Sequence, residues 1–295
     1  MPSNEFYIVD VFAEGKYEGN QLAVFREAAG LSTAEMQAIA REMHFSETTF
    51  LLSDRPTEGG YDVRIFTPET ELPFAGHPTL GTAFVIQREV IKEPAEQVVL
   101  NLKVGRIPVT FSYKGNQPDV LWMRQVPPKF GEQCTAEEVA LALRIGPGDI
   151  DSRFPLQVVS TGIPFLIVPL KTLDAVKRAN PDWAAFDAGT AGKLPRAVLV
   201  FAPETYFQKN DLNVRVFVDE VGVPEDPATG SGNGCLAGYL VKYRYFDRPE
   251  IDLRVEQGYE IKRPSLLLLR AKETESEIEV NVGGRAVFVA KGQLV

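Results

Sequence analysis

Val63-Arg-Ile-Phe66 and Val214-Arg-Val-Phe217 are two copies of one short motif, about 151 residues apart. Pro73-Phe-Ala-Gly76-His77 follows the first copy, and Pro227-Ala-Thr-Gly230-Ser231 follows the second with three extra residues in the interval. Two echoes in the same order at nearly the same offset are difficult to obtain by chance. They predict a duplicated architecture.

Each half has the order strand, acidic loop, Pro-x-x-Gly turn and helix. Small and apolar residues after each turn predict helices that start at His77 and at Ser231. A helix start presents free backbone N–H groups and a partial positive charge, and glycine lets a ligand approach them. We expect Gly76 and Gly230 to mark a paired site for a carboxylate or an enolate in a cleft between the halves. Either glycine alone is equally compatible with a structural turn.

Short Val-, Ile- and Phe-rich runs bounded by turn residues predict strands through the rest of the chain. Ser32-Thr-Ala-Glu35 and Thr135-Ala-Glu-Glu138 are capping boxes that open two further helices, and another helix is expected over Thr172–Ala179. The domain prediction is an N-terminal half over residues 1–118 and a C-terminal half over 119–282. A last strand at about 283–295 is expected to pack back onto the first half.

Composition narrows the function. The chain has 295 residues, 44% of them apolar, and a net charge of −9, which is ordinary for a globular protein and gives no basic surface for nucleic acid. Two cysteines and two histidines make a disulfide framework or a zinc site improbable. We see no signal peptide and no membrane-length apolar run, and expect a cytoplasmic protein with no metal or cofactor.

The glycine-rich segment Gly230-Ser-Gly-Asn-Gly234 invites comparison with nucleotide-binding loops. No Gly-Lys-Ser/Thr follows it, and it sits late in the chain without an obvious acidic residue closing a βαβ unit. The sequence therefore disfavours nucleotide binding.

Four motifs together resemble the PhzF family of phenazine-biosynthesis-type isomerases, which have the diaminopimelate epimerase-like fold. They are Glu18-Gly-Asn-Gln-Leu-Ala-Val24, Ser46-Glu-Thr-Thr-Phe50, Pro73-Phe-Ala-Gly-His-Pro-Thr-Leu-Gly81 and Asp226-Pro-Ala-Thr-Gly-Ser231, and they span most of the chain. The resemblance implies an α+β fold of two pseudo-symmetric domains, each a curled, mainly antiparallel sheet around a central helix. It also implies a homodimer and a substrate site between the domains.

The resemblance assigns roles to residues. Glu47 matches the catalytic acid/base, which takes a proton from one carbon and returns it to another; burial would have to raise its pKa for this. His77, Asp226 and Ser231 match polar catalytic residues, although Ser231 could also be the helix N-cap and Asp226 a turn residue. Expected substrate contacts come from Asn20, Gly76, Gly230 and Gly232.

One departure separates this chain from its two-thiol relatives. True diaminopimelate epimerases carry a cysteine just before each glycine turn, where this chain has Ala75 and Thr229. A two-thiol racemase is therefore excluded, and Cys235, inside the second helix, is expected to be a packed core residue.

The function predicted is cofactor-independent isomerisation of a small carboxylic acid. One alternative is an epimerase or racemase of an amino or hydroxy acid that uses glutamate and a second group. Another is a non-catalytic binding protein of the same fold, which the presence of Glu47, His77, Asp226 and Ser231 argues against. Fold does not specify substrate, so the substrate stays unnamed.

Overall fold

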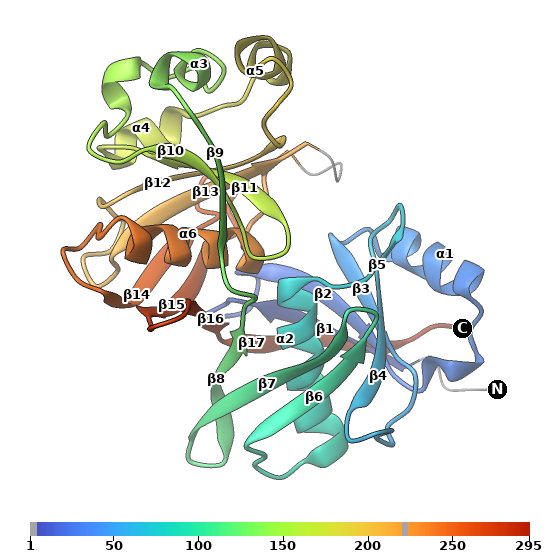
Figure 1. Ribbon diagram of the computed structural model, residues 1–295. Helices are drawn as coiled ribbons and strands as arrows, with labels where there is room; N and C mark the ends of the chain where they lie inside the picture. Colours follow the sequence, from blue (N-terminus) through green and yellow to red (C-terminus); the bar gives the residue numbers. More distant parts are fainter. Residues whose placement is uncertain (1–4, 220–223) are drawn as a thin grey trace. The chain divides into compact units, whose positions relative to one another are not determined.

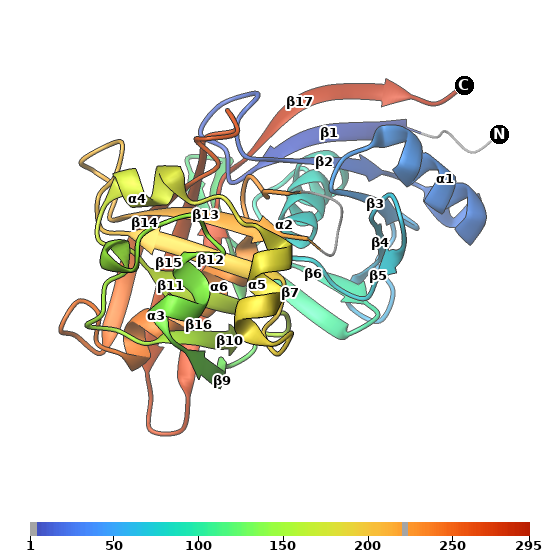
Figure 2. The same cartoon turned by 90° about the horizontal axis from the view of Figure 1, so that it is seen from above.

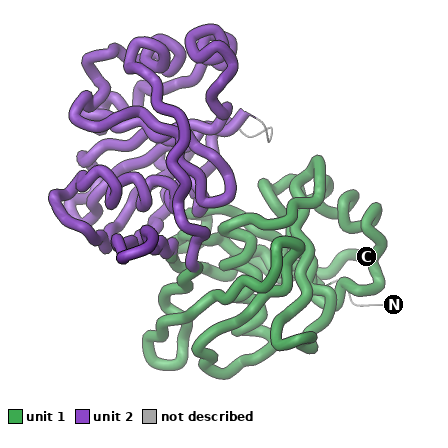
Figure 3. The backbone as a smooth tube through the Cα atoms, in the orientation of Figure 1, with its two compact units in different colours: residues 1–123, 283–295 green, residues 124–282 purple. Residues whose placement is uncertain are grey.

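The computed structural model describes residues 5–219 and 224–295. The chain forms two compact units, unit 1 with residues 1–123 and 283–295 and unit 2 with residues 124–282 (Figure 3). Each unit mixes helices with a curved sheet (Figure 1), so the predicted α+β class is confirmed. Within the described ranges, no helix combines the length and the apolar character that crossing a membrane requires.

The sheet of unit 1 has the strand order β17–β1–β2–β3–β4–β6–β7–β8. The β2–β3 and β4–β6 pairs are parallel, and the other pairs in this order are antiparallel. The strands are β1 (Glu5–Val11), β2 (Asn20–Phe25), β3 (Glu47–Leu51), β4 (Tyr61–Phe66), β5 (Glu71–Leu72, beside β4), β6 (Gln97–Leu102), β7 (Gly105–Lys114), β8 (Gln117–Arg124) and β17 (Ala286–Gln293).

Unit 2 repeats this pattern with the order β9–β10–β11–β12–β13–β14–β15. The parallel pairs, β11–β12 and β13–β14, hold the same places as those of unit 1. The strands are β9 (Lys129–Cys134), β10 (Leu156–Ser160), β11 (Pro164–Pro169), β12 (Ala197–Ala202), β13 (Leu212–Val218), β14 (Glu250–Gln257), β15 (Ser265–Glu273) and β16 (Ile278–Gly284). The repeat seen in the sequence is thus a repeat of topology.

Each sheet curls around one buried helix, α2 (Gly76–Val85) in unit 1 and α6 (Gly230–Lys242) in unit 2 (Figures 1 and 2). Both helices begin one residue earlier than predicted, at the glycine itself. A Cβ atom at Gly81 would lie 2.6 Å from Leu22 Cδ2 and 2.8 Å from Val11 Cγ2. Gly81 therefore lets α2 approach β1 and β2 closely.

Other helices cover the outer faces of the sheets. In unit 1, α1 (Thr33–Met43) packs Met36 and Ala40 against aromatic residues of β2, β3 and β4. In unit 2, α3 (Ala136–Ala140), α4 (Leu173–Arg178) and α5 (Trp183–Thr190) share one core with β11 and β12. The capping boxes predicted for α1 and α3 are both present. Short non-α helices span Ala28–Gly30, Ile86–Ile91 and Pro147–Asp149.

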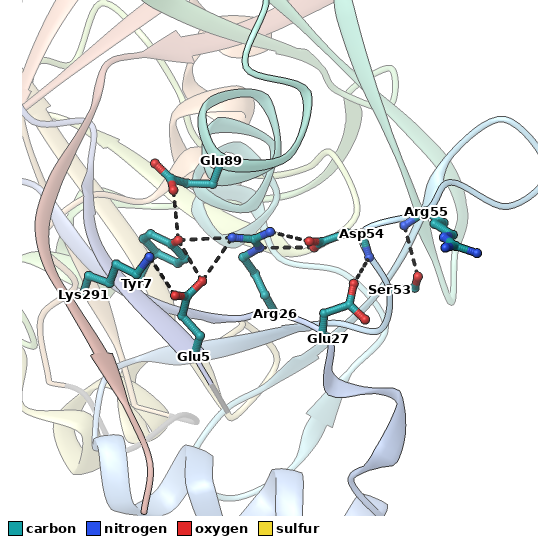
Figure 4. A network of polar contacts seen from close by, with 9 residues as sticks. All are labelled: Glu5, Tyr7, Arg26, Glu27, Ser53, Asp54, Arg55, Glu89 and Lys291. Atoms are coloured by element: carbon teal, nitrogen blue, oxygen red, sulfur yellow. Dashed lines mark hydrogen bonds and ion pairs between the residues drawn. The ribbon is translucent and has the colours of Figure 1, made fainter. Parts of the chain in front are cut away.

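A polar network ties the last strand, β17, into unit 1 (Figure 4). Lys291 Nζ of β17 lies 2.7 Å from Glu5 Oε1 of β1, and the hydroxyl of Tyr7 lies 2.9 Å from carboxylate oxygens of Glu5 and Glu89. Arg26, at the end of β2, donates to the same hydroxyl and pairs with Asp54. Residues from both ends of the chain therefore stabilise one sheet.

Candidate functional site

Glu47 is the first residue of β3, opposite Leu22 in the parallel pairing with β2. Alternate residues of a strand point to the same face, so Glu47 shares a face with Thr49. The Thr49 hydroxyl lies 2.8 Å from the Thr82 hydroxyl of α2. The side chain of Glu47, 16% exposed, therefore points to the face of the sheet that carries α2.

His77, the second residue of α2, meets Glu47. Its Nε2 atom lies 3.3 Å from Glu47 Oε2, and its side chain is 6% exposed. Burial lowers the pKa of His77 to about 3, against the smaller opposing effect of a hydrogen bond to the backbone of Gln21. The ring is therefore neutral at neutral pH, and the contact with Glu47 is not an ion pair.

Asn20, the first residue of β2, is buried. The next residue is Gln21, whose backbone forms a hydrogen bond with His77. The chain enters β2 through Gly19, which has φ of 66°. A Cβ at Gly19 would lie 2.3 Å from the carbonyl oxygen of Val11, so this turn requires glycine. Of the predicted site residues, Asn20, Glu47, Gly76 and His77 lie in unit 1, with Glu47 and His77 in contact.

In unit 2, the start of α6 is braced by side chains. The Thr229 hydroxyl donates to Asp226 Oδ2 at 2.6 Å. Gln257, at the end of β14, donates to the Asp226 carbonyl and to the Thr229 hydroxyl. Its own carbonyl accepts from the Thr229 N–H and from Asn233 Nδ2 at 3.2 and 2.8 Å. Every hydrogen-bonding site of the buried Gln257 amide is thus used.

Ser231 is the second residue of α6 and is half-buried. The N-cap is Thr229, so the reading of Ser231 as the N-cap is wrong. The Ser231 carbonyl accepts a hydrogen bond from the Thr161 hydroxyl at 3.4 Å. Gly232 is buried, and a Cβ there would meet Phe165 and Leu199 at 3.5 and 3.4 Å.

Both central helices start without a side-chain cap. The N-cap residues Ala75 and Thr229 form no capping hydrogen bond, whereas Ser32 and Thr135 cap α1 and α3 fully. Uncapped first-turn N–H groups suit a bound anion. This favours the predicted carboxylate-binding role of the turns at Gly76 and Gly230, which stays a prediction.

The two thiols lie away from the N-cap positions. Cys235 is the sixth residue of α6 and is fully buried, as predicted, and burial raises the pKa of its thiol to about 11. Burial raises the pKa of Cys134, at the end of β9, to about 12. Both thiols therefore stay protonated at neutral pH. Within residues 5–219 and 224–295, no three His, Cys, Asp or Glu side chains gather as metal ligands would.

Gln21, Thr161 and Gln257 were missed by the sequence analysis. Gln21 acts through its backbone, which any residue could supply. Thr161 and Gln257 lie about 70 and 26 residues from Ser231, and no motif surrounds them. Only the folded chain brings them to α6.

The fold of this chain is also found in a solved epimerase structure. A hydroxyproline epimerase of Agrobacterium vitis shares the fold with a TM-score of 0.62 at 11% identity, covering 100% of this chain and 91% of that one. The chain belongs to the phenazine biosynthesis-like family, PhzC-PhzF, whose model matches residues 9–292. The family resemblance read from the motifs is confirmed.

Relatives within the family are similar over their whole length. The trans-2,3-dihydro-3-hydroxyanthranilate isomerase of Pseudomonas fluorescens is 34% identical over 296 residues, covering 99% of each chain. The crystal structure of a PhzF-family protein of Bacillus anthracis gives a TM-score of 0.90 at 27% identity, with full coverage of both chains. The prediction of a PhzF-family isomerase is confirmed at this level.

Proposed function

We propose that this chain isomerises a small, unsaturated carboxylic acid without a cofactor, by a proton transfer between carbons in which Glu47 is the acid/base. The observation that carries the proposal is the contact of Glu47 Oε2 with His77 Nε2 at 3.3 Å, at the uncapped start of α2. A carboxyl group that is largely shielded from water, beside a helix start, can exchange a proton with carbon while backbone N–H groups stabilise the developing negative charge.

The relatives supply a substrate to test. Since one curated relative is named for trans-2,3-dihydro-3-hydroxyanthranilate, we propose a substrate of that chemical kind, a small acid with conjugated double bonds. We propose that this substrate is bound by two sets of groups. They are the side chains of Asn20, Asp226 and Ser231 and the backbone N–H groups of Gly76, Gly230 and Gly232. The proposal that the protein is a homodimer is tested separately, by light scattering.

The test is NMR of trans-2,3-dihydro-3-hydroxyanthranilate with the protein in heavy water. We expect a shifted double bond and deuterium at one carbon of the product. Glu47→Gln should lower the rate about 10²–10⁴-fold, the usual contribution of a general acid or base. Glu69→Gln, at an exposed glutamate of the loop before α2, is the matched control and should retain the rate.

The outcomes separate the alternatives. Retained turnover in Glu47→Gln would remove Glu47 from the acid/base role. Inversion at one carbon of an amino or hydroxy acid, seen by chiral chromatography, would identify an epimerase instead. No turnover, together with saturable binding of the acid, would identify a binding protein.

A further inference from the structure

The side-chain amide of Gln257, the last residue of β14, has its orientation fixed by its partners. The amide oxygen accepts from the Thr229 backbone N–H at 3.2 Å, and a backbone N–H can only donate. The amide nitrogen donates to the Asp226 carbonyl at 2.8 Å, and a carbonyl can only accept. With the oxygen and nitrogen exchanged, both of these contacts would be lost. The second proton of the nitrogen is therefore directed at the Thr229 hydroxyl, 3.0 Å away.

This amide determines where the Thr229 hydroxyl points its proton. The hydroxyl has a single proton, and it accepts from Gln257 Nε2, so its own proton goes to a different partner. That partner is Asp226 Oδ2, at 2.6 Å. Hydrogen bonds to carboxylates are among the strong ones, and the neighbouring bond from Gln257 polarises the hydroxyl further. Gln257 therefore acts on the Asp226 side chain through Thr229.

Asp226 is held at its backbone as well. Its N–H donates to the Val216 carbonyl of β13 at 3.0 Å, and its carbonyl accepts from Gln257. Asp226 is half-buried, whereas Thr229 is 8% exposed and Gln257 is fully buried. A ligand can thus reach Asp226 more easily than it can reach the two residues that orient it.

The matching positions of unit 1 show that the fold does not need this polar set. Thr229 is the N-cap residue of α6, Asp226 lies three residues before it, and Gln257 ends the strand that runs parallel to β13. The residues at these places in unit 1 are Leu72, Ala75 and Leu102. The Thr229 hydroxyl does not cap its own helix either, whereas that of Thr135 caps α3. Since apolar residues suffice at the start of α2, the polar set of unit 2 has a use beyond folding.

We propose that Thr229 and Gln257 are positioning residues that orient the Asp226 carboxylate toward the substrate. The inference rests on the proposed function in taking Asp226 as a substrate-binding residue, and neither positioning residue has to contact the substrate. A displacement of about 1 Å at a site can lower the rate about 10²-fold. Removal of the Thr229 hydroxyl should therefore slow turnover by up to about that factor.

The first test compares kcat/KM for trans-2,3-dihydro-3-hydroxyanthranilate among variants of the full chain. Thr229→Val removes the hydroxyl and keeps the shape, so we expect the large loss, and Thr229→Ser should restore most of the rate. Gln257→Met should lose less, because the hydroxyl is still present but no longer directed. A full rate in Thr229→Val or Gln257→Met, or a loss as large in Thr229→Ser as in Thr229→Val, would overturn the inference.

The matched control is Thr190→Val, at the last residue of α5 in the same unit. The Thr190 hydroxyl is also buried and donates to the Phe186 carbonyl at 2.8 Å, so the control loses a comparable hydrogen bond elsewhere. We expect Thr190→Val to retain the rate. Thermal unfolding of both valine variants establishes that each is folded at the assay temperature. Equal losses of rate in the two variants would assign the effect to stability and overturn the inference.

The second test does not depend on turnover. Crystal structures of the wild type, Thr229→Val and Thr190→Val are compared at the Asp226 side chain. We expect the carboxylate to turn away from position 229 in Thr229→Val and to keep its place in Thr190→Val. An unmoved carboxylate in Thr229→Val would overturn the inference and leave the proposed function intact. Conversely, a wild type without turnover, in which Thr229→Val still moves the carboxylate, would contradict the proposed function alone.

Discussion

Arg64 in unit 1 and Arg215 in unit 2 hold the same place in the repeat, and each pairs with a glutamate five residues before its helix glycine. Arg64 Nε lies 2.8 Å from Glu71, and Arg215 Nη2 lies 2.7 Å from Glu225. Each guanidinium also lies over the phenylalanine two residues on, at 5.1 and 4.7 Å from the ring centroid. The duplication has therefore preserved an ion pair as well as a topology.

The two helix starts differ in chemistry. In unit 1, α2 brings His77 to Glu47, while in unit 2 Thr229, Asp226 and Gln257 brace the start of α6 with hydrogen bonds. The difference teaches that the arginine–glutamate pair is common to both units, whereas the contact between Glu47 and His77 is particular to unit 1. The predictions below test this division.

The largest expected effect distinguishes the two arginines. Arg215 is 10% exposed and also donates to the carbonyls of Val176, Lys177 and Ala179 at the end of α4. Arg215→Met leaves the carboxylate of Glu225, whose side chain is 8% exposed, without its arginine partner. We therefore expect a loss of about 3–5 kcal/mol in the free energy of unfolding. Arg64→Met should cost about 1 kcal/mol or less, because Arg64 is more exposed and Lys103 still pairs with Glu71. Urea unfolding of both variants measures the contrast, and equal losses would contradict it.

Sequence reasoning reached the repeat because the echoed residues are themselves structural. The Val-Arg-x-Phe strands and Pro-x-x-Gly turns must recur if the topology recurs, and capping boxes act within four residues. It missed β9, whose residues are mostly exposed and lack an apolar alternation, and α5, which begins after Asp182 in a proline-marked turn. Local signals are weak at both places.

At the candidate site, too, the sequence predicted individual residues but not the contacts between them. Glu47 and His77 were identified separately from motifs, but their contact spans 30 residues and depends on how β3 and α2 meet. The hydrogen bond between the His77 ring and the backbone of Gln21 carries no sequence signal either. Motifs therefore predicted the two residues, and only the three-dimensional structure shows their contact.

The second prediction uses the buried histidine, which has no counterpart in unit 2. Since the pKa of His77 is about 3 in the folded chain and its ordinary value is 6.5, the unfolded chain binds the proton more tightly. Stability from this group is complete above pH 6.5 and falls as pH decreases toward 3, by at most about 1.4 kcal/mol per pH unit. His77→Gln should flatten the pH dependence of urea unfolding between about pH 4 and about pH 6.

The control for this prediction is His44→Gln, which removes an exposed histidine at the end of α1. If His44→Gln and His77→Gln change the pH dependence equally, burial of His77 is not the cause.

The smallest effect concerns the fourth residue of each central helix. Thr79 Oγ1 donates to the Ala75 carbonyl at 2.7 Å, and Asn233 Nδ2 donates to the Thr229 carbonyl at 3.1 Å, so both side chains bond back to the N-cap residue. Thr79→Val removes that bond and keeps the shape, at an expected cost of about 1 kcal/mol. Asn233→Ala should cost about 2 kcal/mol, because it also leaves the buried Gln257 carbonyl short of a donor. Thermal unfolding measures both, and a larger loss in Thr79→Val would show that unit 1, not unit 2, depends more on its braced helix start.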